Sequence, residues 1–102
     1  MGRDELPRLL AGEPSADPAD ELATTPGWSR NGTAIEKTYR FTDFTSAMLF
    51  VNGVAALAER ANHHPDIAVR YSAVTLSLWT HSAGGLTARD FALARRIDAA
   101  LS

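Results

Sequence analysis

The chain changes from a helical pattern to a strand pattern within Glu59-Arg60-Ala61-Asn62-His63-His64-Pro65-Asp66. Proline disfavours helical geometry at the residue before it, so the helix should end near Ala61 or Asn62. The two adjacent histidines then follow the helix at a bend in the chain. Imidazole has an unperturbed pKa inside the physiological range, so this bend is a candidate site for proton transfer.

An amphipathic helix precedes the bend. Its apolar face is wide enough to pack against more than one neighbouring element or subunit. Thr42 or Asp43 is a suitable N-cap, and a flanking stripe with Phe50 and Leu57 accompanies the main apolar stripe. We expect most of these residues to lie in the core. The main stripe comprises Phe44, Ala47, Met48, Val51, Val54, Ala55 and Ala58.

Alternating apolar and polar residues predict two β-hairpins, one on each side of this helix. Asn31-Gly32 is a dipeptide preferred in two-residue turns, and the arm that follows it, residues 33–41, alternates. After the bend, the pattern alternates from Ile67 to Tyr71 and, after a short break, again from Val74 to Leu78. Each pair of runs is typical of two antiparallel strands.

The two ends of the chain add two further helices. In the proline-rich N-terminal part, Asp17 can cap a short helix that Pro26-Gly27 would stop. At the other end, Thr87 and Asp90 resemble a capping box, and the last helix follows over residues 91–101. The predicted order is therefore α-β-β-α-β-β-α, an α+β fold with helices packed on one face of a four-stranded antiparallel sheet.

Length and composition bound what the protein does. The 102 residues suit one domain, which we assign to residues 27–102, after an N-terminal arm over residues 1–26 that is flexible in part. A formal net charge of −2 shows no basic excess, so nucleic acid is not an expected partner. Cysteine is absent, which excludes disulfides and thiolate catalysis. No signal peptide or membrane-spanning run is evident, and we expect a cytoplasmic protein.

The histidines and their acidic neighbours are the candidate site residues. Glu59 and His63 share a face if the helix reaches His63, and the carboxylate could then hold the imidazole. A solvated surface pair would have the same spacing. His64 should point away from His63, because successive side chains in an extended segment face opposite sides. His81 follows a strand and precedes a glycine-rich, flexible turn, where a side chain can project into a cleft or simply face solvent.

Other interpretations of these residues stay open at this point. Imidazole and carboxylate groups bind zinc and iron, but the chain has no HExxH motif and neighbouring histidines that point apart rarely chelate one ion, so no metal is expected. No serine lies in a nucleophile elbow. Asp90 can serve merely as a capping carboxylate. Acid/base catalysis by histidine is the chemistry that remains.

The residues from about Trp28 to Leu101 resemble the pterin-4a-carbinolamine dehydratase family. The resemblance rests on a glutamate, paired histidines before proline, a later Thr-His and a Gly-Leu-Thr-x-x-Asp run, and it covers about three quarters of the chain. The proline-rich N-terminal part departs from the family pattern. The matching residues are Tyr39 to Phe44, Ala58-Glu59, Asn62 to Asp66, Val69, Tyr71, Leu78, Thr80-His81, Gly84 to Thr87 and Asp90.

The resemblance implies a hydro-lyase that dehydrates 4a-hydroxytetrahydropterin to quinonoid dihydropterin and so recycles the pterin cofactor of aromatic amino-acid hydroxylases. The pterin is the substrate, so no separate cofactor and no metal are implied. By resemblance, the catalytic residues are His63, His81 and His64, and the sequence does not decide which of the first two is the acid. Glu59 and Asp90 are implied to orient them. The implied substrate contacts are His64, Asn62, Pro65 and Thr80.

The family fold is similar to the predicted one, and family members assemble as dimers or tetramers. The resemblance therefore implies a homodimer or homotetramer, with an aromatic amino-acid hydroxylase as pathway partner. Some relatives instead serve as the dimerisation partner of a transcription factor or help to assemble a carboxylating enzyme. A non-catalytic assembly or coactivator module is thus the alternative function, although such a module has no physical need for three positioned imidazoles.

Overall fold

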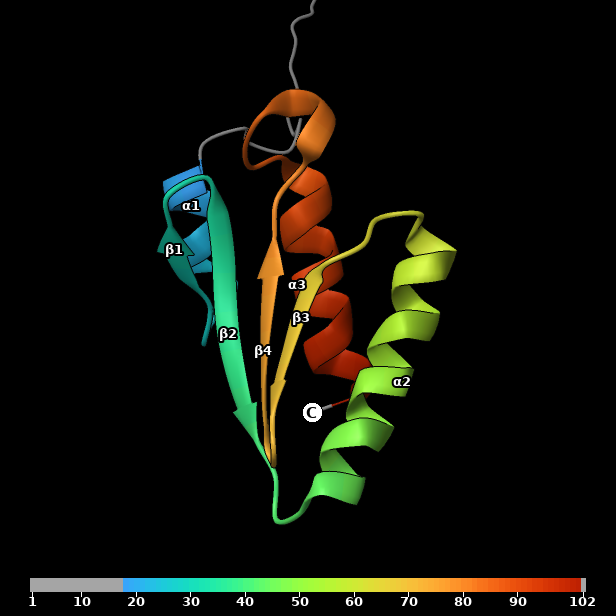
Figure 1. Ribbon diagram of the computed structural model, residues 1–102. Helices are drawn as coiled ribbons and strands as arrows, with labels where there is room; N and C mark the ends of the chain where they lie inside the picture. Colours follow the sequence, from blue (N-terminus) through green and yellow to red (C-terminus); the bar gives the residue numbers. More distant parts are fainter. Residues whose placement is uncertain (1–17, 102) are drawn as a thin grey trace, which may run out of the picture.

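The computed structural model describes residues 18–101, and its elements follow the order predicted from the sequence (Figure 1). The strands form a four-stranded antiparallel sheet in the order β1-β2-β4-β3, and α2 and α3 cover one of its faces. The predicted α+β fold is confirmed. The elements are α1 (Pro18–Ala23), β1 (Ser29–Asn31), β2 (Ala34–Arg40), α2 (Phe44–Ala61), β3 (Asp66–Arg70), β4 (Ala73–Leu78), the short 3-10 helix η1 (His81–Ala83) and α3 (Ala88–Leu101).

The core lies between the sheet and the helices, because alternate residues of the central strands face α2 and α3. Val74, Leu76 and Leu78 of β4 are fully buried. Across the sheet, Ile35 of β2 pairs with Leu78 and Tyr39 pairs with Val74, so both strands present their apolar residues on the same face. The helices complete the core with Ala47, Phe50, Val54 and Ala58 from α2 and Phe91, Leu93, Ala94 and Ile97 from α3.

The buried stripe of α2 is rotated relative to the predicted one. The pattern placed Phe50 on a flanking stripe, but Phe50 is in the core, whereas Phe44 is 49% exposed and Ala55 is also exposed. The rings of Tyr39 and Phe41 lie 4.5 and 5.1 Å from the ring of Phe50, measured between centroids. These aromatic contacts from β2 and the residue after it hold Phe50 inside, and Phe44 is correspondingly turned outward.

Both predicted hairpins are present, with turns that differ in position from the sequence pattern. The first turn consists of Gly32-Thr33, one residue later than predicted, because Asn31 is paired within β1. Gly32 takes the positive φ of 64° that this turn requires. The pattern also predicted Tyr71 in a strand, but Tyr71 lies in the second turn with a φ of 54° and is 71% exposed.

The short N-terminal helix is present and is held against α3 by polar contacts. Arg95 donates to the Glu21 carboxylate at 3.2 Å and to the Thr25 hydroxyl at 3.0 Å. The predicted cap, Asp17, lies outside the described residues, and the division of the chain at residue 26 stays a prediction. Within residues 18–101, no helix combines the length and the apolar character needed to cross a membrane.

Asp98 on α3 joins the last helix to the first hairpin. Its carboxylate accepts hydrogen bonds from Trp28 Nε1 at 2.9 Å, Lys37 Nζ at 3.1 Å and the Tyr39 hydroxyl at 2.5 Å. Lys37 and Asp98 form an ion pair, which explains how the charged Lys37 can lie on the otherwise apolar face of β2. Burial opposes the charged carboxylate, but the three donors hold the pKa of Asp98 below its usual value. Burial, followed by the bond to Asp98, raises the pKa of Tyr39.

The substitution Asp98→Asn is expected to lower the free energy of unfolding by about 1–2 kcal/mol near neutral pH, because three donors lose a charged acceptor. A carboxylate with a depressed folded-state pKa stabilises the fold above its unfolded pKa of about 4, and this contribution is lost as the pH falls through the folded pKa. The difference between wild type and variant in urea unfolding should therefore shrink in acid. Asp66→Asn, at an exposed position on β3, is the control and should stay within about 0.5 kcal/mol of wild type. A pH-independent Asp98→Asn difference would contradict this account.

Candidate active site

The end of α2 releases the two neighbouring histidines in different directions. Asn62 adopts the left-handed conformation, with φ 50° and ψ 44°, and the His63 N–H donates back to the Ala58 carbonyl at 3.1 Å. This is the hydrogen bond of a Schellman-type helix end, where asparagine is often found in the left-handed position. The helix therefore ends at Ala61, as predicted, and leaves His63 buried and His64 exposed.

A buried aspartate at the start of α3 holds His63. Asp90 has no exposed surface, and its Oδ1 lies 2.6 Å from His63 Nε2. Its Oδ2 accepts from the Thr80 hydroxyl at 2.9 Å and from the Thr87 N–H at 2.8 Å. The second contact is the backward half of a capping box, and α3 accordingly begins at Ala88, three residues earlier than predicted. An ionised Asp90 carboxylate could only accept, in which case Nε2 of His63 would be the donor and Nδ1 would be left for exchange.

Two threonine hydroxyls extend this network. The hydroxyl oxygens of Thr80 and Thr87 lie 2.7 Å apart. Because Thr80 donates its only hydroxyl proton to Asp90, Thr87 is the donor between the two hydroxyls. Thr80, predicted as a substrate contact, is 5% exposed, and its hydroxyl is engaged by the carboxylate. The hydroxyl of Thr80 thus holds the Asp90 carboxylate, and Thr80 also forms part of the wall of the cleft described below.

The second carboxylate pairs with the second histidine. His64 Nε2 lies 2.6 Å from Glu59 Oε2, and the two side chains are 56% and 77% exposed. Helical spacing would pair Glu59 with His63, but the helix ends before it reaches His63, and the Glu59 carboxylate contacts His64 instead. The expected Glu59–His63 pair is therefore replaced by a Glu59–His64 pair.

His81 begins the turn after β4 and stacks on Trp79. The ring centroids are 3.9 Å apart, with 27° between the ring planes. Between these two residues, Thr80 exchanges backbone hydrogen bonds with Gly85 in both directions. The predicted glycine-rich turn is present and is closed by these bonds, and Gly84 takes a positive φ of 71° after η1. Its flexibility stays a prediction.

A cleft of about 430 Å³ lies among these residues. Its lining residues come from the end of the molecule where α2 ends, η1 turns and α3 begins, an arrangement of elements that Figure 1 shows. All three histidines line it, together with the predicted residues Asn62 and Thr80. Glu59, Asp90 and Pro65 do not line the cleft, although the two carboxylates contact histidines that do. The lining residues are Asn62, His63, His64, Trp79, Thr80, His81, Ser82 and Arg89.

Sequence reasoning missed Trp79, Ser82 and Arg89. Arg89 donates from Nη2 to the Asn62 carbonyl at 2.8 Å and so ties α3 to the end of α2. It occupies an unspecified position in the Gly-Leu-Thr-x-x-Asp run, so the motif does not single it out. A cation in the first turn of a helix, where the macrodipole disfavours positive charge, is the signal that could have found it. With His63, Arg89 also lines a second hollow of about 380 Å³ between α2 and α3.

Two carboxylate–imidazole pairs with the same 2.6 Å separation differ in burial, which allows a matched comparison. Asp90→Ala should lower the free energy of unfolding by about 3 kcal/mol, because the His63 ring and the Thr87 N–H lose their buried acceptor. Glu59→Ala should change it by less than about 0.5 kcal/mol, because exposed pairs contribute little. Urea unfolding near neutral pH measures both, and equal effects of the two substitutions would refute the role given to burial.

Several known proteins are similar to this chain. The sequence profile described as "Pterin 4 alpha carbinolamine dehydratase" matches residues 14–100. A relative from Thermomicrobium roseum, named "Putative pterin-4-alpha-carbinolamine dehydratase", is 57% identical over 79 residues, which are 78% of this chain and 85% of the relative. A relative of the same name from Chloroflexus aurantiacus is 50% identical over 93 residues, which are 91% of this chain and 96% of the relative.

Two solved structures have a similar fold. A protein from Brucella melitensis, described as a transcriptional coactivator/pterin dehydratase, has a TM-score of 0.75 at 34% identity and covers 79% of this chain and 88% of its own. A pterin dehydratase-like protein described as a RuBisCO assembly factor in the alpha-carboxysome has a TM-score of 0.58 at 25% identity, over 71% of this chain and 83% of its own. With the profile match over most of its length, this chain belongs to the pterin 4 alpha carbinolamine dehydratase family.

Proposed function

We propose that this protein dehydrates 4a-hydroxytetrahydropterin to quinonoid dihydropterin by histidine acid/base catalysis. The observation that carries the proposal is a cleft lined by three histidines, one of them held by a buried carboxylate, in a member of a dehydratase family. The names of the relatives support the same activity. The product would return to the pterin cofactor pool of aromatic amino-acid hydroxylases, which are the proposed pathway partners.

The reaction removes one proton from the pterin ring and delivers one to the leaving group. The C4a–O bond breaks, a double bond forms between C4a and N5, and water leaves, so no oxidant or reductant is required. A base must accept the N5 proton and an acid must protonate the departing hydroxyl, and imidazole suits both steps near neutral pH. Neither step requires a metal, and the absence of a metal and of a separate cofactor stays a prediction.

The contacts of the histidines suggest how the two steps are divided. His63 is the proposed base, because its Nε2 faces Asp90 and its Nδ1 is free to accept, while the carboxylate stabilises the charge that forms on the ring. His81 is the proposed acid, because it is exposed and can exchange protons with solvent. His64, held by Glu59 at the exposed side of the cleft, is the proposed substrate contact.

Purified protein should accelerate the decay of enzymatically generated 4a-hydroxytetrahydropterin, measured by stopped-flow absorbance. His63→Ala and His81→Ala should each lower the rate by about 100-fold or more, as expected for loss of a general acid or base. His64→Ala is the comparison and should raise KM more than it lowers kcat. Folded wild-type protein that gives no acceleration over buffer would rule out the proposed activity.

A second candidate function is a non-catalytic assembly or coactivator module. The descriptions of the two solved structures, a transcriptional coactivator and an assembly factor, favour keeping it. A stoichiometric partner that is retained by a variant with all three histidines replaced by alanine would support this function. Absence of any stoichiometric partner of the wild-type protein would count against it.

The cytoplasmic location stays a prediction.

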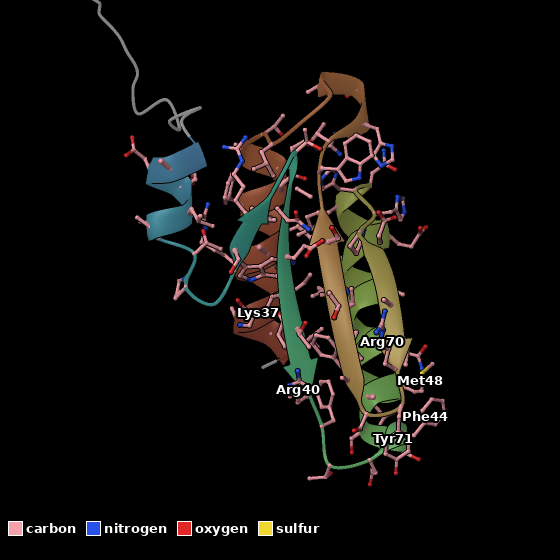
Figure 2. All side chains as sticks on the ribbon, turned by 60° about the vertical axis from the view of Figure 1, so that its left-hand side comes forward. Lys37, Arg40, Phe44, Met48, Arg70 and Tyr71 are labelled. Atoms are coloured by element: carbon pink, nitrogen blue, oxygen red, sulfur yellow. The ribbon has the colours of Figure 1, made fainter. Side chains whose placement is uncertain are left out.

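Assembly into a homodimer or homotetramer is also part of the proposal. β3 is an outer strand of the described sheet and pairs there with β4, so its other edge has open backbone groups. Ile67 and Val69 on this strand are each 37% exposed. Phe44, Met48 and Tyr71 lie at the end of the sheet where this hairpin turns and α2 begins (Figure 2). These apolar groups support a subunit contact along β3.

Val69→Lys is expected to shift the protein towards monomer in sedimentation velocity, because a charge on an edge strand discourages pairing with another chain. Ser29→Lys, on the outer strand at the opposite side of the sheet, is the matched control and should leave the sedimentation coefficient unchanged. A wild-type protein that sediments as a monomer at all concentrations would contradict the proposed assembly.

A further inference from the structure

His81 has a different kind of partner from the other two histidines. His63 and His64 each place Nε2 at 2.6 Å from a carboxylate oxygen. The His81 ring instead lies on the indole of Trp79, with centroids 3.9 Å apart and 27° between the planes. Within residues 18–101, the structure gives neither ring nitrogen of His81 a hydrogen-bond partner. The indole therefore supplies the ring contact that defines the orientation of this imidazole.

The backbone around Thr80 explains why these two rings meet. Thr80 is extended, with φ −103° and ψ 107°, so the side chains of Trp79 and His81 project to the same side and that of Thr80 to the other. Thr80 is held by backbone bonds to Gly85 and by its hydroxyl bond to Asp90. The hydrogen bonds around the Asp90 carboxylate thus also fix the position of Thr80 and, with it, the backbone that carries Trp79 and His81.

We propose that Trp79 is the positioning residue for His81, an inference that rests on the proposed dehydration. A stacked indole fixes the plane of the imidazole and leaves both ring nitrogens unoccupied. One nitrogen can then give its proton to the departing hydroxyl as the C4a–O bond breaks, and the exposed ring recovers a proton from water. A carboxylate partner, as at His63, would occupy one of the two nitrogens.

Two simpler roles for Trp79 lead to different results. If the indole only fills space beside the cleft, an aliphatic side chain should preserve the rate in a folded protein. If it binds the pterin ring, its loss should raise KM, and the loss should be felt whether or not His81 is present. The face of the indole that His81 covers is not available to the substrate, which favours action through the histidine.

The test compares Trp79→Leu with Trp79→Phe, each in the wild-type and the His81→Ala backgrounds. Trp79→Leu should lower kcat by about 10-fold or more and change KM by less than about 3-fold, and Trp79→Phe should recover most of the rate because it retains an aromatic face. In the His81→Ala background, Trp79→Leu should lower the rate by less than about 2-fold, because residues that act as a unit are not additive. Urea unfolding should first show that each variant is folded.

Nuclear magnetic resonance of the His81 ring protons adds a measurement that does not depend on activity. The stacked indole should shift these protons upfield by its ring current, and the shift should be lost in Trp79→Leu and partly kept in Trp79→Phe. A folded Trp79→Leu protein with the wild-type kcat, or equal losses in both backgrounds, would overturn the inference alone. A wild-type protein without dehydratase activity would overturn the proposed function and this inference with it.

Discussion

The buried carboxylate of Asp90 determines how one end of this molecule is arranged. A charged group without solvent is costly unless donors surround it, and three separate segments supply those donors. The end of α2 supplies the ring of His63, the residues after β4 supply the hydroxyl of Thr80, and the start of α3 supplies the amide of Thr87. The hydrogen bonds to this one carboxylate therefore bring a helix end, a strand end and a helix start together around the cleft.

The three imidazoles that line this cleft are held in three different ways. His63 is fixed by the buried carboxylate of Asp90, which lies 2.6 Å from its Nε2. His64 is held by an exposed carboxylate, a contact that orients the ring at little cost or gain in stability. His81 is held by the face of an indole, which leaves its nitrogens free. The proposed division into base, substrate contact and acid rests on these differences in the environment of one residue type.

Local features of the sequence predicted the elements and most of the cleft, but not its long-range contacts. Pro65 identified the end of α2, and periodicity identified the strands and the helices that flank the histidines. The partner of Glu59 could not be predicted, because helical spacing assumes a helix that continues to His63. Asp90, which actually holds that ring, lies 27 residues further along the chain. Trp79 carried no signal, because an aromatic residue at a strand end is usually part of the core.

The most direct test of the central claim is the dehydration rate of Asp90→Asn relative to wild type, measured as the stopped-flow decay of 4a-hydroxytetrahydropterin. The substitution keeps the size of the side chain but replaces an accepting oxygen with a donor, so the ring, hydroxyl and amide donors around it cannot all be satisfied. His63 then loses its fixed protonation pattern, and a rate lower by at least about 10-fold is expected in folded protein. A folded Asp90→Asn protein that turns over at the wild-type rate would contradict the claim that the buried carboxylate prepares His63 for proton transfer.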